Sequence, residues 1–199
     1  MKKLIGLLTL VSLLAIRSPA IGQTQPEKVE KEKAQSPVGV GGIVYGEGHS
    51  YMLSAPKGWV LDNQSGTSQG LVAVFYPVGG SWADSPSVMY SRIQPKEGKT
   101  LDEVIEKDID YMRKMSPSIV ATKQEPIAYG KDKKLATVRY LSADKAGNLE
   151  AIGYMEESNW VVLLILTARN EKDFKSCLSA FKEIVESYMY LTDKVDIKK

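Results

Sequence analysis

The sequence predicts an α+β fold in which helices cover both faces of an antiparallel β-sheet, an α/β/α sandwich. Strand candidates occur in two groups, and an amphipathic helix follows each group. Two of the strand candidates, Leu71–Tyr76 and Trp160–Leu166, are apolar on both faces, whereas a strand with only one covered face alternates apolar and polar residues. A helical layer on each side of the sheet is the simplest way to bury both faces.

Five strand candidates make up the first group. They are short runs of β-branched, aromatic and other apolar residues, and Gly, Pro, Asn or Ser lies at their ends. They cover residues 43–45, 51–55, 59–61, 71–77 and 88–94, and a loop rich in Gly, Ser and Pro, residues 78–87, separates the last two. We expect these strands to form an antiparallel meander.

A helix over residues 101–115 follows the first group. Thr100 and Glu103 have the spacing of a capping box, in which each side chain accepts a hydrogen bond from the backbone amide of the other residue. The apolar residues of this segment recur at helical spacing and are Leu101, Val104, Ile105, Ile109, Met112 and Met115. The helix should end before Ser116 because a proline follows it.

The second group predicts consecutive antiparallel hairpins and a final helix. Its strand candidates cover residues 123–129, 134–142, 149–157 and 160–168, and the Asp, Asn and Gly residues between them are typical of turns. Asn170 is the expected N-cap of the last helix. One face of that helix carries Phe174, Cys177, Leu178, Phe181, Ile184, Val185 and Tyr188.

The first 22 residues have the pattern of a cleavable signal peptide. Lys2 and Lys3 precede an apolar run over residues 4–16, and Ala20 and Gly22 are small residues in the positions that a signal peptidase recognises. No Cys lies at the cleavage point, so we expect a secreted or periplasmic protein that is not a lipoprotein. The expected organisation is a signal peptide (1–22), a disordered linker (23–42), one domain (43–191) and a flexible tail (192–199).

The charge balance gives no basic surface for binding nucleic acid. The full chain has 26 basic and 24 acidic residues, but removal of residues 1–22 removes Lys2, Lys3 and Arg17 and leaves 23 basic residues. The mature net charge is therefore about −1, too small to attract polyanions. Cys177 is the only cysteine, so an intramolecular disulfide is excluded.

A short motif at the second strand resembles a known family. Tyr51, Pro56, Gly58 and Trp59 match the aromatic-x-x-x-x-Pro-x-Gly-Trp opening of the PsbP/Mog1-like superfamily, and the order of elements over residues 43–191 is similar. The resemblance implies an α/β/α sandwich that serves as a non-enzymatic binding or assembly module, as in photosystem accessory subunits, a nuclear-transport factor and bacterial envelope proteins. It implies no catalytic residues. With the signal peptide, it favours another envelope or secreted protein as the partner.

Three residues are candidates for contacts with a partner: Trp82, His49 and Tyr90. Trp82 is a large aromatic in the middle of the loop 78–87, where aromatic residues often mediate recognition. The alternative is that Trp82 folds back and caps the sheet. His49 is the only histidine, and a tight transition-metal site usually needs several His or Cys ligands, so we expect no metal and no cofactor.

Two other functions remain open at this stage. Residues 66–70 match G-x-S-x-G, which would make Ser68 the nucleophile of a serine-type hydrolase, with His49 as the other candidate catalytic residue. However, that motif needs a strand before it and a helix after it, and here a strand follows. The other alternative is a carrier of a small apolar ligand held between the sheet and a helix. The Asp- and Asn-containing segment 144–150 lacks the spacing of a calcium loop and is interpreted as a hairpin turn.

Overall fold

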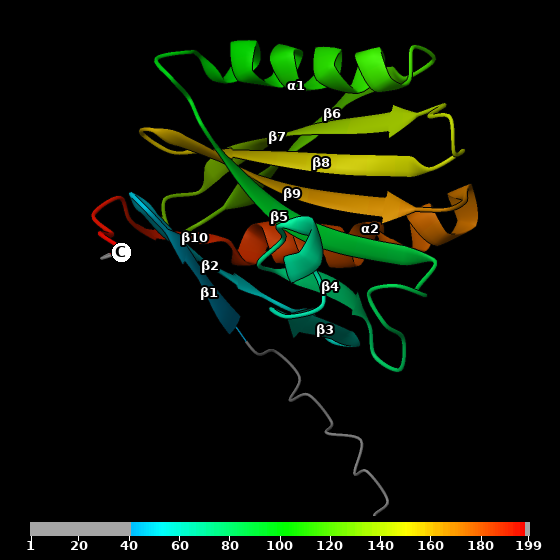
Figure 1. The fold of residues 1–199 in the computed structure, drawn as a ribbon, viewed down its shortest axis with the longest axis horizontal. Coiled ribbons are helices and arrows are strands. Elements are labelled where there is room, and N and C mark those ends of the chain that lie inside the picture. The colour runs from blue at the N-terminus through cyan, green and yellow to red at the C-terminus, as the bar shows by residue number, and fades with distance from the viewer. Residues whose placement is uncertain (1–40, 198–199) are drawn as a thin grey trace, which may run out of the picture. The chain divides into compact units, whose positions relative to one another are not determined.

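The computed structural model describes residues 41–197, which form ten strands and two α-helices (Figure 1). The expected signal peptide and most of the expected linker lie outside the described residues. The elements, in order, are β1 (Gly41–Gly46), β2 (His49–Ser54), β3 (Trp59–Asp62), the 3-10 turn η1 (Thr67–Gln69), β4 (Val74–Pro77), β5 (Ser87–Pro95), α1 (Leu101–Met115), β6 (Val120–Tyr129), β7 (Lys134–Ser142), β8 (Leu149–Glu156), β9 (Trp160–Ala168), α2 (Glu171–Ser187) and β10 (Met189–Thr192).

The strands form two sheets, whereas we expected one. The larger sheet has the order β3-β4-β5-β9-β8-β7-β6, and the smaller one has the order β1-β2-β10 (Figure 1). The consecutive antiparallel hairpins from β6 to β9 are confirmed. The first group is not a simple meander, because β2 lies between β1 and the C-terminal strand β10 and pairs with both, and β5 pairs along its whole length with β9. These pairings join segments that are far apart in the sequence.

The prediction for residues 71–77 is wrong in its first half. Only Val74–Pro77 is a strand, and the side chain of Val72 is 51% exposed, so this apolar run is not covered on both faces. Gly70 ends the η1 turn with a left-handed φ of 73°, a conformation that glycine adopts at little cost. The chain therefore reaches the sheet only at Ala73, which is buried.

The apolar strand β9 does supply side chains to two separate clusters. Val162, Leu164 and Leu166 pack in the cluster that contains the buried residues of α2, and the alternate residues pack in the cluster that contains those of α1. Successive side chains of a strand point to opposite faces. The two clusters therefore receive side chains from opposite faces of this central strand.

The two helices lie at different distances from the sheet. The backbone of α2 approaches β9, β6 and β8 closely, and within residues 41–197 no strand comes as near to the backbone of α1 (Figure 1). On β8, the side that faces α2 carries Ala151, Gly153 and Met155, and a Cβ added to Gly153 would lie 3.1 Å from Val185 Cγ2. The side that faces α1 carries Ile152 and Tyr154. The missing side chain of Gly153 thus lets α2 lie close to β8.

The helix boundaries follow the sequence closely. The capping box is present: the Glu103 amide donates to Thr100 Oγ1, and the Thr100 amide donates to Glu103 Oε2. At the second helix the Asp173 amide donates to Asn170 Oδ1, as the N-cap prediction requires. Cys177 is buried in the apolar face of α2, where the sequence placed it.

The residues after β10 make hydrogen bonds to the turn between β1 and β2. The Gly48 amide donates to the Val195 carbonyl at 2.8 Å, and the Ile197 amide donates to Glu47 Oε2 at 3.0 Å. Trp160 Nε1 donates to the Gly48 carbonyl from the start of β9. This turn therefore joins the smaller sheet, the larger sheet and the segment that we expected to be a flexible tail.

Candidate functional site

Two cavities meet at Tyr90 on β5. The first, here called the hairpin cavity, lies between the β1–β2 hairpin and β5 and has a volume of about 700 Å³. The second, here called the helix cavity, lies between α1 and the larger sheet and has a volume of about 350 Å³. Both volumes fall within the range of small-molecule and recognition sites.

The hairpin cavity brings together all three candidate residues. His49 lies on β2, Trp82 in the loop between β4 and β5, and Tyr90 on β5, and all three line the cavity. Tyr45 and Val72 also line it, with exposed fractions of 67% and 51%. These two exposed side chains give the cavity an apolar rim.

Trp82 packs against Tyr90 and remains half-buried. The two rings meet edge to face with their centroids 5.9 Å apart, a favourable aromatic geometry. Hydrogen bonds between Ser81 and Asp84 fold the loop on either side of the indole. The indole therefore contacts Tyr90 on one side and keeps part of its surface accessible.

His49 is held by its neighbours and is oriented by one hydrogen bond. Its Nδ1 lies 3.0 Å from the Glu47 carbonyl oxygen, and because a carbonyl only accepts, Nδ1 carries the proton of this bond. Its ring centroid lies 4.9 Å from that of Trp160. In the part of the chain that the structure describes, no three His, Cys, Asp or Glu side chains gather as a set of metal ligands.

Ser68 does not stand on a strand-to-helix turn. It lies in the exposed 3-10 turn η1, and the next regular element is strand β4. Within residues 41–197, no hydrogen bond joins Ser68 to His49. The arrangement therefore lacks the nucleophile–base contact of a serine hydrolase.

We expect the substitution Ser68→Ala to change the free energy of unfolding by less than about 0.5 kcal/mol, because the side chain is exposed and has few contacts. A fluorophosphonate probe should label neither the wild type nor the variant. Ser158→Ala, another exposed loop position, serves as the control. Stoichiometric labelling of the wild type that Ser68→Ala abolishes would establish the hydrolase alternative.

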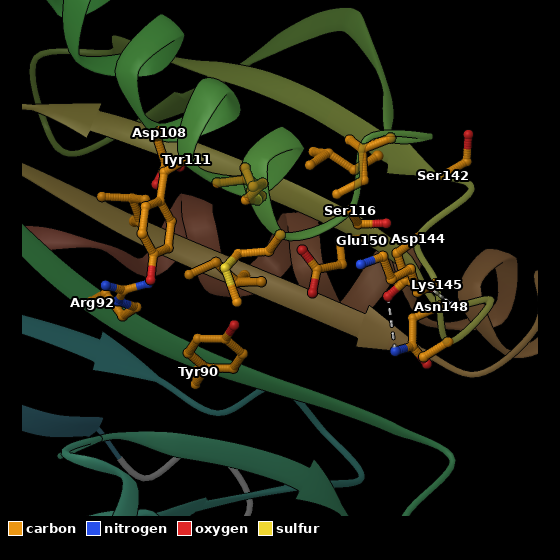
Figure 2. A pocket seen from close by; sticks show the side chains of 18 residues that line it. Tyr90, Arg92, Asp108, Tyr111, Ser116, Ser142, Asp144, Lys145, Asn148 and Glu150 are labelled. Atoms are coloured by element: carbon orange, nitrogen blue, oxygen red, sulfur yellow. Dashed lines mark hydrogen bonds between the residues drawn. The ribbon is translucent and has the colours of Figure 1, made fainter.

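The helix cavity was not predicted from the sequence, and Figure 2 shows its lining. Its side chains come from the second half of α1, from β5, β7, β8 and β9, and from the turn between β7 and β8. Most of its wall is apolar, and the polar groups labelled in Figure 2 lie at its two ends and around Glu150. It exists because α1 stands away from the strands beneath it.

Glu150 and two tyrosines have perturbed ionisation in this region. Burial raises the pKa of Glu150, whereas the hydrogen bond donated by Thr167 Oγ1 at 3.0 Å lowers it. Burial also raises the pKa of Tyr90 to about 12. Tyr154 donates to Asp108 Oδ2 at 2.8 Å, and burial together with this carboxylate raises the pKa of Tyr154 well above its usual range.

One sequence signal could have pointed to Glu150. Along β8 the residues at even positions from 150 to 154 share one face, and Ile152 and Tyr154 bury that face against α1. An acidic residue on an otherwise apolar face of a strand is unusual, because burial of a carboxylate costs free energy. From the sequence alone, residue 150 is interpreted only as part of the turn over residues 144–150.

The protein belongs to the α+β class: its strands form antiparallel sheets, and two helices contribute to the buried clusters on the larger sheet. No family model matches the chain, and no curated protein matches it. Among solved structures, the chain is similar to cyanobacterial PsbP (CyanoP) from Synechocystis sp. PCC 6803, with a TM-score of 0.50 and 14% identity over 80% of this chain and 96% of that one. It is also similar to the Ran-binding protein Mog1p from Saccharomyces cerevisiae, with a TM-score of 0.47 and 11% identity over 77% and 96% of the two chains.

The chain has the fold of cyanobacterial PsbP. The resemblance that Tyr51, Pro56, Gly58 and Trp59 indicate is thus confirmed at the level of the fold. In the described part of the chain, no helix combines the length and the apolar character needed to cross a membrane.

Proposed function

We propose that this chain is an exported, non-catalytic binding module, built as an α/β/α sandwich, that docks on another envelope or secreted protein. The observation that carries the proposal is the hairpin cavity, where Trp82, His49 and Tyr90 lie together beside an exposed apolar rim. Aromatic side chains that are partly buried in a concave surface are common anchors of protein–protein contacts. Export rests on the signal-peptide pattern of residues 1–22, and the proposed module comprises the elements from β1 to β10.

The shape of the hairpin cavity supports a protein partner. It is open, it is lined by a mixture of polar and apolar groups, and it runs between two sheets rather than into the core. Tyr45 and Val72 extend the apolar surface beyond the cavity, where a partner backbone could cover them. A protruding side chain of the partner would enter between His49 and Trp82.

The test is the substitution Trp82→Ala, measured on both binding and stability. We expect affinity for a partner captured from the native envelope fraction to fall about 30-fold, because removal of an aromatic anchor costs about 2 kcal/mol. The melting temperature should change little, since Trp82 is only half-buried. Leu135→Ala, an exposed apolar position on β7 outside both cavities, is the matched control.

The capping alternative predicts the opposite result for the same variant. If Trp82 mainly holds Tyr90 and the sheet edge in place, Trp82→Ala should lower the melting temperature strongly, since Trp to Ala in a packed site costs about 3–5 kcal/mol. Intact partner binding together with this loss of stability would remove Trp82 from the docking site.

A second candidate function is the carriage of a small ligand. It is favoured by one observation: the helix cavity lies between α1 and the sheet and is mostly apolar. Concave, mostly apolar cavities with a few polar groups are typical of small-molecule sites. The two functions use different cavities and can be tested separately.

A further inference from the structure

The helix cavity has walls suited to the apolar part of a small molecule. Its floor consists of strand residues that face α1, and its roof consists of residues from the last turns of α1 and the loop after it. The apolar side chains that form these walls include Met112, Met115, Ile119, Leu141, Ile152 and Ile165. Methionine side chains adapt to ligands of different shapes, and two of them lie in the roof.

Glu150 places a carboxyl group in this apolar wall. Its Oε1 accepts a hydrogen bond from Thr167, and within residues 41–197 no other side chain donates to Glu150. Figure 2 shows the Glu150 carboxyl directed into the space between Tyr90 and α1. The Glu150 carboxyl is half-buried and accepts one side-chain hydrogen bond, so protein contacts replace only part of the hydration that it loses on burial.

The charges around Glu150 favour a cation over an anion. Asp108 and Asp144 line the same cavity, and both raise the pKa of Glu150 by repulsion. The basic residues of the lining, Arg92 and Lys145, are exposed, and neither forms a salt bridge within the described residues. The inner part of the cavity therefore carries an excess of negative charge.

Two hydroxyl groups add hydrogen-bonding capacity to the lining. Tyr90 is directed toward the cavity in Figure 2. Ser116 follows α1 and is only 7% exposed, and its Oγ has no hydrogen-bond partner within residues 41–197. A buried hydroxyl without a partner is unfavourable, so Ser116 adds an unsatisfied polar group to the wall of this cavity.

We infer that the helix cavity binds a small amphipathic amine, with the apolar body against the methionine and aliphatic walls and the protonated amine at Glu150. An anion would meet three carboxyl groups, and a purely apolar ligand would leave the Glu150 carboxyl with only its hydrogen bond from Thr167. An ammonium group supplies both the charge and the donors that Glu150 lacks. This inference rests on the ligand-carriage alternative and is independent of docking at the hairpin cavity.

Amine binding should depend on pH through Glu150. An ammonium group favours the ionised form of the Glu150 carboxyl, so binding of the amine displaces the proton from protonated Glu150. The affinity for the amine should therefore increase as pH rises through the pKa of Glu150 in the free protein. The other groups that face the cavity are Asp108 from α1, Tyr90 and Arg92 from β5, and Asp144 and Lys145 from the turn between β7 and β8. Tyr90, with a pKa of about 12, stays neutral over the acidic and neutral range.

The test compares three probes of one shape on the full-length protein: 2-phenylethylamine, 2-phenylethanol and phenylacetate. Titrations followed by isothermal calorimetry and by the methyl NMR signals of Met112 and Met115 should show the amine binding at least ten-fold more tightly than the other two. Equal affinity of the alcohol, tighter binding of the acid, or no shift of the two methyl signals with the amine would overturn the inference.

Variants separate this site from the docking site. Glu150→Gln should weaken binding of 2-phenylethylamine at least ten-fold and remove its pH dependence, whereas Glu125→Gln, an exposed position on β6, should leave both unchanged. Tyr45→Ala, at the rim of the hairpin cavity and not in the lining of the helix cavity, should not affect amine binding, and Glu150→Gln should not affect partner binding. Unchanged amine affinity in Glu150→Gln would refute the inference; if that variant does not fold, the wild-type comparison of the three probes decides.

Discussion

Replacement of Phe181 by alanine should lower the free energy of unfolding by about 3–5 kcal/mol, the usual cost of removing a large aromatic side chain from a packed core. Phe181 is 1% exposed and lies in the same buried cluster as Leu164 of β9. Its ring approaches β8 where Gly153 has no side chain: a Cβ added there would lie 3.4 Å from Phe181 Cζ. Because the helix and the strand are already close, the cavity left by alanine cannot collapse easily.

Urea unfolding followed by circular dichroism measures this loss for Phe181→Ala. Lys172→Ala, an exposed position on the same helix, is the control and should change stability by less than about 0.5 kcal/mol. A loss below 1 kcal/mol in Phe181→Ala would mean that α2 does not cover the sheet in the register described above.

The substitution Trp160→Ala should have the second largest effect, a loss of about 2–3 kcal/mol, below the value for a fully buried tryptophan because Trp160 is half-buried. Its Nε1 donates to the Gly48 carbonyl at 2.9 Å, and its ring packs on His49. These contacts attach the β1–β2 turn to the start of β9 and thus connect the two sheets.

Trp160→Phe separates the two contributions of this residue. Phenylalanine keeps most of the aromatic contact with His49 but cannot donate to Gly48, so the expected loss is about 1 kcal/mol. Amide hydrogen exchange at Gly48 and Val44 should accelerate more in Trp160→Ala than in Trp160→Phe, because the hairpin loses more of its attachment. Equal exchange rates in both variants would show that packing of the indole does not fix the hairpin.

Local interactions explain the parts of the fold that were predicted correctly. The capping box of Thr100 and Glu103 and the N-cap Asn170 act within a few residues of the sequence, and they define where α1 and α2 begin. The hairpins from β6 to β9 are likewise set by turn residues between adjacent strands. Such features are visible in a sequence because both partners are near each other in it.

Long-range contacts explain the errors. β10 was missed because Met189–Thr192 directly follows α2 and becomes a strand only by pairing with β2, more than a hundred residues earlier. The division into two sheets follows from the same pairing. Residues 71–72 have a strand-like composition, but they follow the η1 turn and the chain reaches the sheet only at Ala73. Tertiary context overrides local propensity in each case.

The α+β class, both helices with their caps, the hairpin series and the candidate residues Trp82, His49 and Tyr90 are all predictable from the amino-acid sequence. That these three side chains line one cavity follows from the tertiary fold, because each belongs to a different segment and their proximity depends on how the β1–β2 hairpin meets β5. The helix cavity also depends on tertiary packing: Gly153 of β8 lets α2 lie close to the sheet, whereas α1 lies farther from the strands and leaves space beside Glu150.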